Sequence, residues 1–302
     1  MGLSAFQGGT SQMAMTNTTS GVGLTTTADA FTPEDFGGLV DLAVKARSIA
    51  ARSATVFSTN RDKVTFPVWV ADPDVAFYGE LDTIAETDGD TDEVTVSIYK
   101  TAGISLLSNE LRDDSDPAVA ELLGAGLANK IGRAVDGAFL GNTTAKGPDG
   151  LLSIAYTSVN TGAGLTNLDP FTEARYAAID NGSELTSWIV SPATAEAISK
   201  LKVANGSNQN LLEFVEDGIR VAGLPVLVSD QVDNQTVFWG IPREHVVLVM
   251  RKGTTVERFP AVHQDGTYVR AVSRFGIGFL NEAGVVRGHA LGSGEGEGEG
   301  ES

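Results

Sequence analysis

The sequence contains no cysteine and only three histidines among its 302 residues. The absence of cysteine excludes disulfides and thiolate metal sites, and it is compatible with any reducing compartment. The spacing of His245, His263 and His289 relative to Ser, Asp and Glu suggests neither a catalytic triad nor a histidine metal site. We therefore expect these histidines to have structural roles.

Motifs for nucleotide binding and hydrolysis are also missing. No G-x-S-x-G nucleophile elbow is present. The Gly124-Ala125-Gly126 triplet lies in an expected helix, with Asn129 in place of the third glycine of a dinucleotide fingerprint. The segment from Gly141 to Lys146 lacks the phosphate-loop pattern. The sequence therefore predicts no enzyme activity and no cofactor.

Long apolar runs are absent as well. No stretch of eighteen apolar residues exists, so we expect no membrane span. The N-terminus has neither a basic region nor an apolar core, so it does not have the pattern of a signal peptide.

Positive charge is scarce. Lys and Arg number 21 against 39 Asp and Glu, which gives a formal net charge of −18. Because a protein that grips nucleic acid needs excess cations to displace counterions, we expect no sequence-specific DNA binding. An acidic subunit can still enclose DNA without adhering to it, and net charge alone also serves solubility.

A long helix is predicted from Asp116 to Leu140, and the rest of the chain is organised around it. Asp116 suits the N-cap, Pro117 suits the first helical position, and Gly141 follows the last turn. At 1.5 Å per residue this rod is roughly 36 Å long. Its apolar residues recur near the helical period: Val119, Leu122, Leu123, Leu127, Ile131, Ala134, Val135 and Ala138.

Four glycines, Gly124, Gly126, Gly132 and Gly137, lie inside this predicted helix. Each costs on the order of 1 kcal/mol relative to alanine. Intrinsic propensity therefore does not hold the helix together. We expect other elements, and other chains, to pack closely against its backbone.

The N-terminal part begins with an arm, residues 1–30, that is rich in Thr, Ser and Gly and has one charged residue, Asp29. Such a segment buries little apolar surface, so it is either disordered or ordered by a neighbouring subunit through Phe6 and Leu24. A capped helix is predicted to start at Thr32-Pro33, within residues 31–59.

Residues 60–103 are predicted to form an extended two-stranded loop. Apolar residues alternate over 64–70 and again over 94–98, which is typical of strands. From Asp72 to Glu93 there are nine acids and no Lys or Arg. Because an isolated two-stranded ribbon is marginal in water, we expect it to rest on another surface. A basic partner and a solvated acidic loop both remain open.

Asp88, Asp90 and Asp92 have the spacing that opens a calcium-binding loop. Glu93 stands where that loop needs glycine, and Tyr99 stands where it needs the closing glutamate. We therefore assign no metal site and keep the three aspartates as a weak candidate.

The second half is predicted to be an α+β insert, residues 151–250, followed by further strands. Helices are predicted to start at Asp169-Pro170 and Ser191-Pro192. Strands are predicted over 188–190, 219–221, 225–229, 237–241 and 246–250, then over 254–263, 267–279 and 284–289. The chain thus leaves one domain, builds a second and returns. The Gly/Glu tail, residues 291–302, is either natural or a remnant of expression.

The order of these features resembles the major capsid proteins of tailed bacteriophages, which have the Hong Kong phage-type fold. The similar stretches are SNELRDDSDP before the long helix, AFLGNTTAKGPDGLL after it, and VRAVSRFGIGFLNEAGVVRG near the end. Loose matches before the helix are Ser108, Glu110, Leu111, Asp114 and Ser115. Close matches after it are Phe139, Leu140, Gly141, Pro148, Gly150 and Leu151. The resemblance covers about residues 30 to 290.

The resemblance implies a mixed α+β fold with the parts of a capsid subunit. In order, these are the N-terminal arm 1–30, a peripheral-domain helix in 31–59, the extended loop 60–103, the peripheral domain with its spine helix 104–150, the axial domain 151–250, peripheral-domain strands 251–290, and the acidic tail 291–302.

The resemblance also implies the function of a major capsid protein of a tailed double-stranded DNA phage. Its subunits would assemble as hexamers and pentamers into an icosahedral shell around the genome, in the cytoplasm of a host bacterium. No scaffolding segment precedes the arm, so a separate scaffold protein is expected unless the chain is a processed form. A portal protein is expected too, and a cement protein is an option.

Some members of that family link their subunits through an isopeptide bond between a lysine of the extended loop and an asparagine. Here Lys63 and Lys100 lie at the base of the loop, and its tip has no lysine. We therefore expect a non-covalent shell whose subunits run as a single intact band on a denaturing gel. Contacts between subunits are expected at Phe6, Leu24, Phe77, Tyr78, Glu80, Asp82, Glu86, Lys130 and Arg133.

Two alternatives remain. An encapsulin-type bacterial nanocompartment shares the fold and encloses cargo enzyme instead of DNA, although the long uncharged arm and the acidic loop favour the phage. A soluble α+β enzyme is the alternative of a different class. It requires convergent titratable groups in a cleft, which the sequence does not offer.

Overall fold

The structure is a computed structural model that describes residues 48–71, 74–80, 83, 86, 90–110, 119–162, 165, 167–202, 214–215, 218–251, 253–261 and 263–290. The predicted arm, the first part of the helical segment predicted over 31–59, the start of the long helix and the Gly/Glu tail therefore lie outside the described residues. The described end of that segment holds a short helix, Ile49–Ser53, and then a strand, Thr55–Thr59, which the sequence did not predict.

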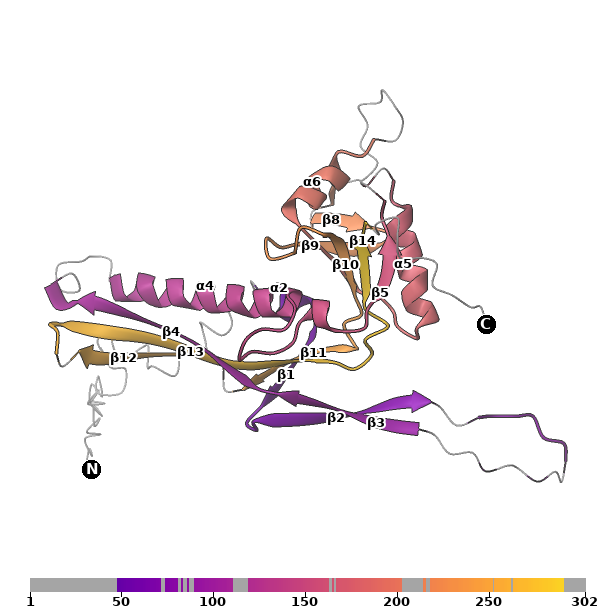
Figure 1. Cartoon of the computed structure of the whole chain (residues 1–302), viewed down its shortest axis with the longest axis horizontal. Coiled ribbons are helices and arrows are strands. Elements are labelled where there is room, and N and C mark those ends of the chain that lie inside the picture. The colour runs from indigo at the N-terminus through magenta and orange to yellow at the C-terminus, as the bar shows by residue number, and fades with distance from the viewer. Residues whose placement is uncertain are drawn as a thin grey trace, which may run out of the picture.

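The long helix α4 spans Val119–Leu140 and lies along the strands β4 (Tyr99–Ser108) and β13 (Gly266–Phe279) (Figure 1). This confirms the predicted helix through to its last residue. Its buried face carries Ala128, Ile131, Val135, Ala138 and Phe139. These residues recur at three- and four-residue intervals, so one face of the helix covers the sheet.

Two members of the predicted apolar stripe lie off that face. Leu122 is 63% exposed and Ala134 is exposed as well. Leu122 precedes Ile131 by nine residues, which is about two and a half turns, so its side chain leaves the opposite side of the helix. The prediction that Leu122 belongs to the buried stripe was wrong, because it considered that the residue is apolar but not on which side of the helix its side chain lies.

The first sheet is built on β13, which pairs antiparallel with β4 along one edge (Figure 1). Along its other edge, β13 pairs with β12 (Thr255–Ala261) and then with β11 (Val246–Arg251). β1 (Thr55–Thr59) adds to β11 in parallel. The long strand β13 therefore pairs with three of the other four strands of this sheet.

The second sheet has the strand order β5-β14-β10-β6-β9-β8-β7. Its strands are β5 (Thr157–Asn160), β6 (Ser187–Val190), β7 (Phe214–Val215), β8 (Gly218–Val221), β9 (Leu224–Val228), β10 (Thr236–Ile241) and β14 (Val286–His289). The helices α5 (Asp169–Asp180) and α6 (Pro192–Ser199) belong to this part (Figure 1). Its core holds Phe171 between Trp188 and Phe238, with ring centroids 5.1 and 4.3 Å away.

The predicted helix starts of the insert are partly correct. Ser191 caps α6, because its Oγ accepts a hydrogen bond from the N–H of Thr194 at 3.2 Å, and Pro192 follows at the first helical position. Asp169 does not cap α5. It lies inside the first turn, and Leu168 occupies the cap position without a side-chain hydrogen bond.

Two strands were predicted in one part of the molecule but belong to the sheet of the other part. β11 was grouped with the insert but lies in the first sheet, between β1 and β13. β14 was grouped with the late peripheral strands but joins the insert between β5 and β10. A buried apolar strand has the same pattern in either sheet, so the sequence did not distinguish between the two.

The ribbon of β2 (Lys63–Ala71) and β3 (Asp90–Ser97) is a separate antiparallel pair that projects from the body (Figure 1). This confirms the predicted two-stranded excursion. The chain rejoins the first sheet at Tyr99, where β4 begins to pair with β13. Residues 99–103 therefore belong to that sheet rather than to the extended loop in which they were predicted.

The base of the ribbon crosses β13 at two glycines. A Cβ added to Gly276 or Gly278 would come within 3.0 Å of Ser97 or Val96. Val96 is buried there together with Val247 and Val249 of β11. The glycines in the late sequence thus allow two backbones to cross closely, which fixes the direction in which the ribbon leaves the body.

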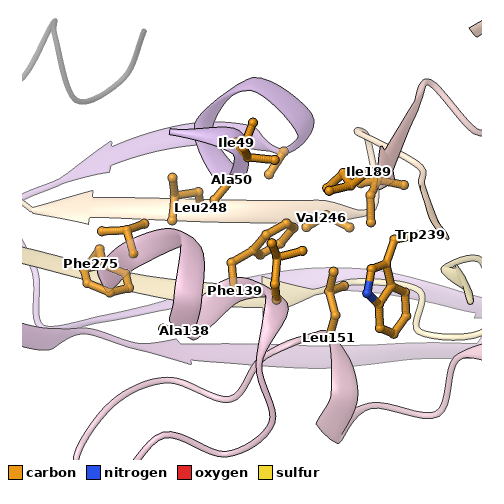
Figure 2. Close-up of a cluster of buried hydrophobic side chains, with 14 of the residues drawn as sticks. Ile49, Ala50, Ala138, Phe139, Leu151, Ile189, Trp239, Val246, Leu248 and Phe275 are labelled. Carbon is orange, nitrogen blue, oxygen red and sulfur yellow. The ribbon is translucent and has the colours of Figure 1, made fainter. Parts of the chain in front are cut away.

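The main hydrophobic cluster joins the two sheets at the C-terminal end of α4. Figure 2 shows Phe139 and Leu151 beside Trp239 of the insert and Val246 of the first sheet. These four side chains are fully buried. Phe139 also stacks on Phe279, with ring centroids 6.5 Å apart. The body is therefore held by one continuous core, from which the ribbon projects.

Replacement of Gly278 by alanine is expected to destabilise the isolated subunit by about 1–3 kcal/mol, because the new methyl group overlaps Val96. Gly126→Ala is the matched control. A Cβ there meets nothing within 4 Å, so the gain in helix propensity should stabilise the subunit by about 0.5–1 kcal/mol. Chemical denaturation measures both, and equal effects of the two substitutions would contradict the crossing.

Candidate subunit-contact surfaces

The short helix α2 (Ile49–Ser53) is attached to α4 by a buried carboxylate. Asp136 of α4 is 7% exposed, and its Oδ1 accepts hydrogen bonds from Ser48 Oγ at 2.6 Å and from the Ala50 N–H at 3.0 Å. Ser48 also caps α2, since its Oγ accepts from the Ala51 N–H at 3.3 Å. The chain at Ser48 and Ala50 is therefore fixed to α4.

Burial raises the pKa of Asp136 above the ordinary value for aspartate, and the negative charge of Asp230 adds to the rise. Hydrogen bonds from Ser48, Ala50 and Ile49 oppose this effect without cancelling it. Folding therefore favours the protonated form of this carboxyl. Sequence reasoning missed Asp136, because a single acid within a helical stripe carries no signal of its partner 88 residues away.

The chain that follows α4 contains the stretch AFLGNTTAKGPDGLL, which matches the capsid proteins closely, and its geometry explains the glycines there. Gly150 lies against the last turn of the helix, and a Cβ there would overlap the carbonyl oxygens of Ala138 and Gly141. The Leu152 N–H donates to the Gly141 carbonyl at 3.0 Å. The chain therefore turns back onto its own helix end, which supplies partners for carbonyls that the helix leaves unpaired.

The ribbon carries large apolar side chains in full contact with solvent. Trp69 is 66% exposed, Val75 is 96% exposed and Phe77 is 108% exposed. A solvent-exposed aromatic residue on a projecting two-stranded element forgoes about 1.5–3 kcal/mol of burial. These side chains are thus available to a partner surface.

The other predicted contact residues of the ribbon are also exposed where the structure describes them. Tyr78 is 40% exposed, and Glu80 and Glu86 are exposed. Asp82, Phe6 and Leu24 lie outside the described residues. Exposure makes these contacts feasible, and the contacts themselves stay a prediction.

The outward face of α4 is open. A Cβ added to Gly126 would meet no atom of the described residues within 4 Å. Leu122 is exposed one turn earlier, and Lys130 is exposed one turn later. Arg133 of the same face forms an ion pair with Asp230 at 2.5 Å within its own subunit. The predicted close approach to the helix glycines is therefore found inside the subunit at Gly137, where an added Cβ would lie 3.3 Å from Gln231 Oε1, but not at Gly126.

Chemistry-bearing groups do not converge in the part of the chain that the structure describes. No three His, Asp or Glu side chains there are placed to hold a metal ion. Asp90 and Asp92 lie in β3, and Asp92 accepts a hydrogen bond from the Glu93 N–H at 2.7 Å, while Asp88 lies outside the described residues. Among the described helices, none is long and apolar enough to cross a membrane.

A hollow of about 370 Å³ lies between β3, the loop after α4 and the end of β13. Asp149 and Glu282 are among its lining residues. Glu282 is engaged with the backbone, because its Oε2 accepts from the Ala155 N–H at 3.0 Å. The Glu282 carboxylate therefore holds the chain that follows α4 at Ala155, which is a structural role.

Several solved structures share this fold. The capsid of an empty GTA particle shares 22% identity and a TM-score of 0.69 over 80% of this chain and 89% of the other. A structure from Microbacterium phage Oxtober96 gives 16% identity and 0.68, covering 81% and 91%. One from Mycobacterium phage Adephagia gives 15% and 0.68, covering 82% and 91%. No curated protein is detectably similar in sequence.

The profile of the Phage capsid family matches residues 29–289. The chain therefore belongs to the Phage capsid family, and both the predicted resemblance and the predicted α+β capsid fold are confirmed. The family and its fold indicate a structural protein of a phage capsid.

Removal of the Asp136 carboxylate by Asp136→Ala is expected to destabilise the subunit by about 1–3 kcal/mol, because a buried hydroxyl and a buried N–H lose their acceptor. Glu196→Ala, which removes a carboxylate from an exposed ion pair, is the control and should change little. Urea unfolding measures both, and equal losses would show that the buried contact contributes nothing special.

The pH dependence of stability should report the raised pKa of Asp136. Its contribution is fully present below the unfolded pKa of about 3.9 and is lost as pH rises through the higher folded pKa. Asp136→Asn does not titrate, so the stability of the natural chain relative to this variant should fall from pH ~4 to pH ~7. A difference that rises with pH would mean that folding favours the ionised carboxylate.

Proposed function

We propose that this chain is the major capsid protein of a tailed double-stranded DNA bacteriophage and that it assembles as hexamers and pentamers into an icosahedral shell. The observation that carries the proposal is the ribbon. It is a two-stranded element that exposes Trp69, Val75 and Phe77 while the body behind it has a complete core. A two-stranded pair is marginal alone, so the ribbon gains its burial on a neighbouring subunit.

The N-terminal segment supports the same proposal. Ser48, at the start of the described chain, is held against α4 by its hydrogen bond to Asp136. The outward face of α4 presents Gly126 and Leu122 with no covering side chain in the described part of the subunit. Neighbouring copies would cover this face, with contacts that include Lys130 and Arg133.

We infer that the shell is held without covalent links between subunits. Lys63 pairs with Ser97 at the base of the ribbon, and Lys100 lies in β4 of the body. A lysine at the base of the ribbon stays beside its own subunit and does not reach the neighbouring subunit that the tip would contact. Subunits from mature particles should therefore run as one band on a denaturing gel.

The charge of the chain fits a container for DNA. At −18 the subunit repels the packaged phosphates, so the genome is enclosed rather than gripped. We propose assembly in the cytoplasm of the host bacterium with a separate scaffold protein and a portal, and a cement protein where the shell needs added strength. An encapsulin-type compartment with cargo enzyme is the second candidate, and the DNA content of purified particles separates the two.

Replacement of the exposed ribbon aromatic by Phe77→Ser is expected to leave the subunit's unfolding free energy unchanged and to abolish or strongly reduce shell formation. A side chain that is solvated in the subunit loses nothing there, whereas an interface loses about 1.5–3 kcal/mol per buried contact. Tyr176→Ser on α5, where the tyrosine is 63% exposed, is the control. Negative-stain microscopy reads out shells, and normal shells from Phe77→Ser would contradict the role of the ribbon.

A further inference from the structure

The face of the first sheet that points away from α4 is cationic in an otherwise acidic protein. Side chains alternate along β13, so Val269 and Ala271 are buried while Arg270 and Arg274 are exposed. Ala271 belongs to the same core cluster as Ile131 of α4, which identifies the buried side. We call the exposed Lys100, Arg270 and Arg274, together with the partly buried Arg251, the cationic face.

Two of these cations lie directly against each other. Lys100 of β4 and Arg274 of β13 are cross-strand partners on the same face. Neither forms an ion pair with another described residue of its subunit. Like charges opposite each other destabilise a sheet, so an anion over this pair would relieve the repulsion.

A hollow of about 220 Å³ adjoins this pair. It is lined by three guanidinium groups, from Arg251, Arg270 and Arg274, and by one carboxylate, from Glu257. Glu257 is engaged with Arg270, whose guanidinium also lies 4.8 Å from the ring centroid of Phe259. Arg251 is engaged with Asp62, so Arg274 is the one of the three arginines that has no ion pair with a described residue. Together with Lys100 it leaves a surplus of positive charge beside the hollow, and guanidinium groups bind carboxylates in a planar, bidentate manner.

We propose that the cationic face binds the Gly/Glu tail, residues 291–302, of a second copy of this chain. The tail carries Glu295, Glu297, Glu299 and Glu301 and no cation. The glycines between these glutamates allow its backbone to approach the sheet surface closely.

The spacing of the glutamates in the tail agrees with the spacing of the arginines on the cationic face. In an extended segment, glutamates at every second residue point to one side and recur about every 6.6–6.8 Å. Arg270 and Arg274 are four residues apart in β13, so they lie about 13 Å apart, which is twice that repeat. Two alternate glutamates of the tail can therefore pair with the two arginines, with the glutamate between them over the hollow.

The tail comes from another copy because of where its own subunit releases it. β14 belongs to the second sheet and runs away from β13 (Figure 1). His289 pairs with Thr236, at the end of β10 opposite to Ile241, so the chain leaves β14 on the insert, whereas the cationic face lies on the first sheet. This inference rests on the proposed assembly of many copies, and it adds an ionic contact that the ribbon does not supply.

Disulfide trapping in assembled particles tests the proposal, and the chain has no natural cysteine to interfere. Thr255→Cys places a thiol in the lining of the hollow, and Gly298→Cys places one between two glutamates of the tail. Mild oxidation of the double variant should give a ladder of linked subunits on a non-reducing gel. Gly298→Cys combined with Thr172→Cys, on the exposed surface of α5, should give none.

The charge requirement is tested in the same double variant. Replacement of the four tail glutamates by glutamine should cause loss of the ladder, and so should high salt during oxidation, because surface ion pairs are screened. A ladder that survives both changes would overturn the ionic basis of the contact.

Two further results would also overturn the proposal. A disulfide formed within single subunits would assign the face to the chain's own tail. A ladder from Val75→Cys with Thr255→Cys, but none from the tail, would assign it to the acidic ribbon. Microscopy of each sample keeps the two ideas separate, because shells without tail linkage refute only this contact, whereas the absence of shells refutes the proposed function.

Discussion

The packing of α4 across β4 and β13 is the constraint on which the other elements depend. The helix contains four glycines, which together cost about 4 kcal/mol relative to alanine. Ile131, Val135, Phe139 and Leu140 are buried on or next to its packed face, and each contributes roughly 1.5–3 kcal/mol. Burial therefore outweighs the loss of helix propensity, and it does so on one side of the helix only.

This one-sided burial recurs in the rest of the molecule. β13 carries α4 on one face and leaves Arg270 and Arg274 exposed on the other. The base of the ribbon is fixed by Gly276 and Gly278, whereas the part beyond Ala71 exposes Val75 and Phe77. Each element is anchored at one side or end inside the subunit and is free at the other. Such a subunit is folded but has surfaces that other copies can cover.

Much of this architecture could be predicted from the sequence, because periodicity and turn chemistry are local. The helix through Leu140, the ribbon strands, β12, β13 and the Ser191 cap follow from patterns within a few residues. The order of these features also led correctly to the capsid family, which no single motif identifies.

The remainder depended on contacts between distant parts of the chain. The exchange of β11 and β14 between the sheets is set by pairing partners, which a buried apolar run does not specify. The bond between Ser48 and Asp136 and the opposition of Lys100 and Arg274 join residues 88 and 174 positions apart. Short stretches of sequence carry no signal for such pairs, so the candidate contact surfaces became visible only in three dimensions.

Hydrogen exchange of the β2–β3 amides, compared between isolated subunits and assembled particles, tests the central claim most directly. The account predicts fast exchange along the ribbon in the isolated subunit, where two strands have no covering layer, and strong protection after assembly. The amides of α4 should be protected in both states. Equal protection of the ribbon in the isolated subunit would show that it is complete without its neighbours, which would contradict the account.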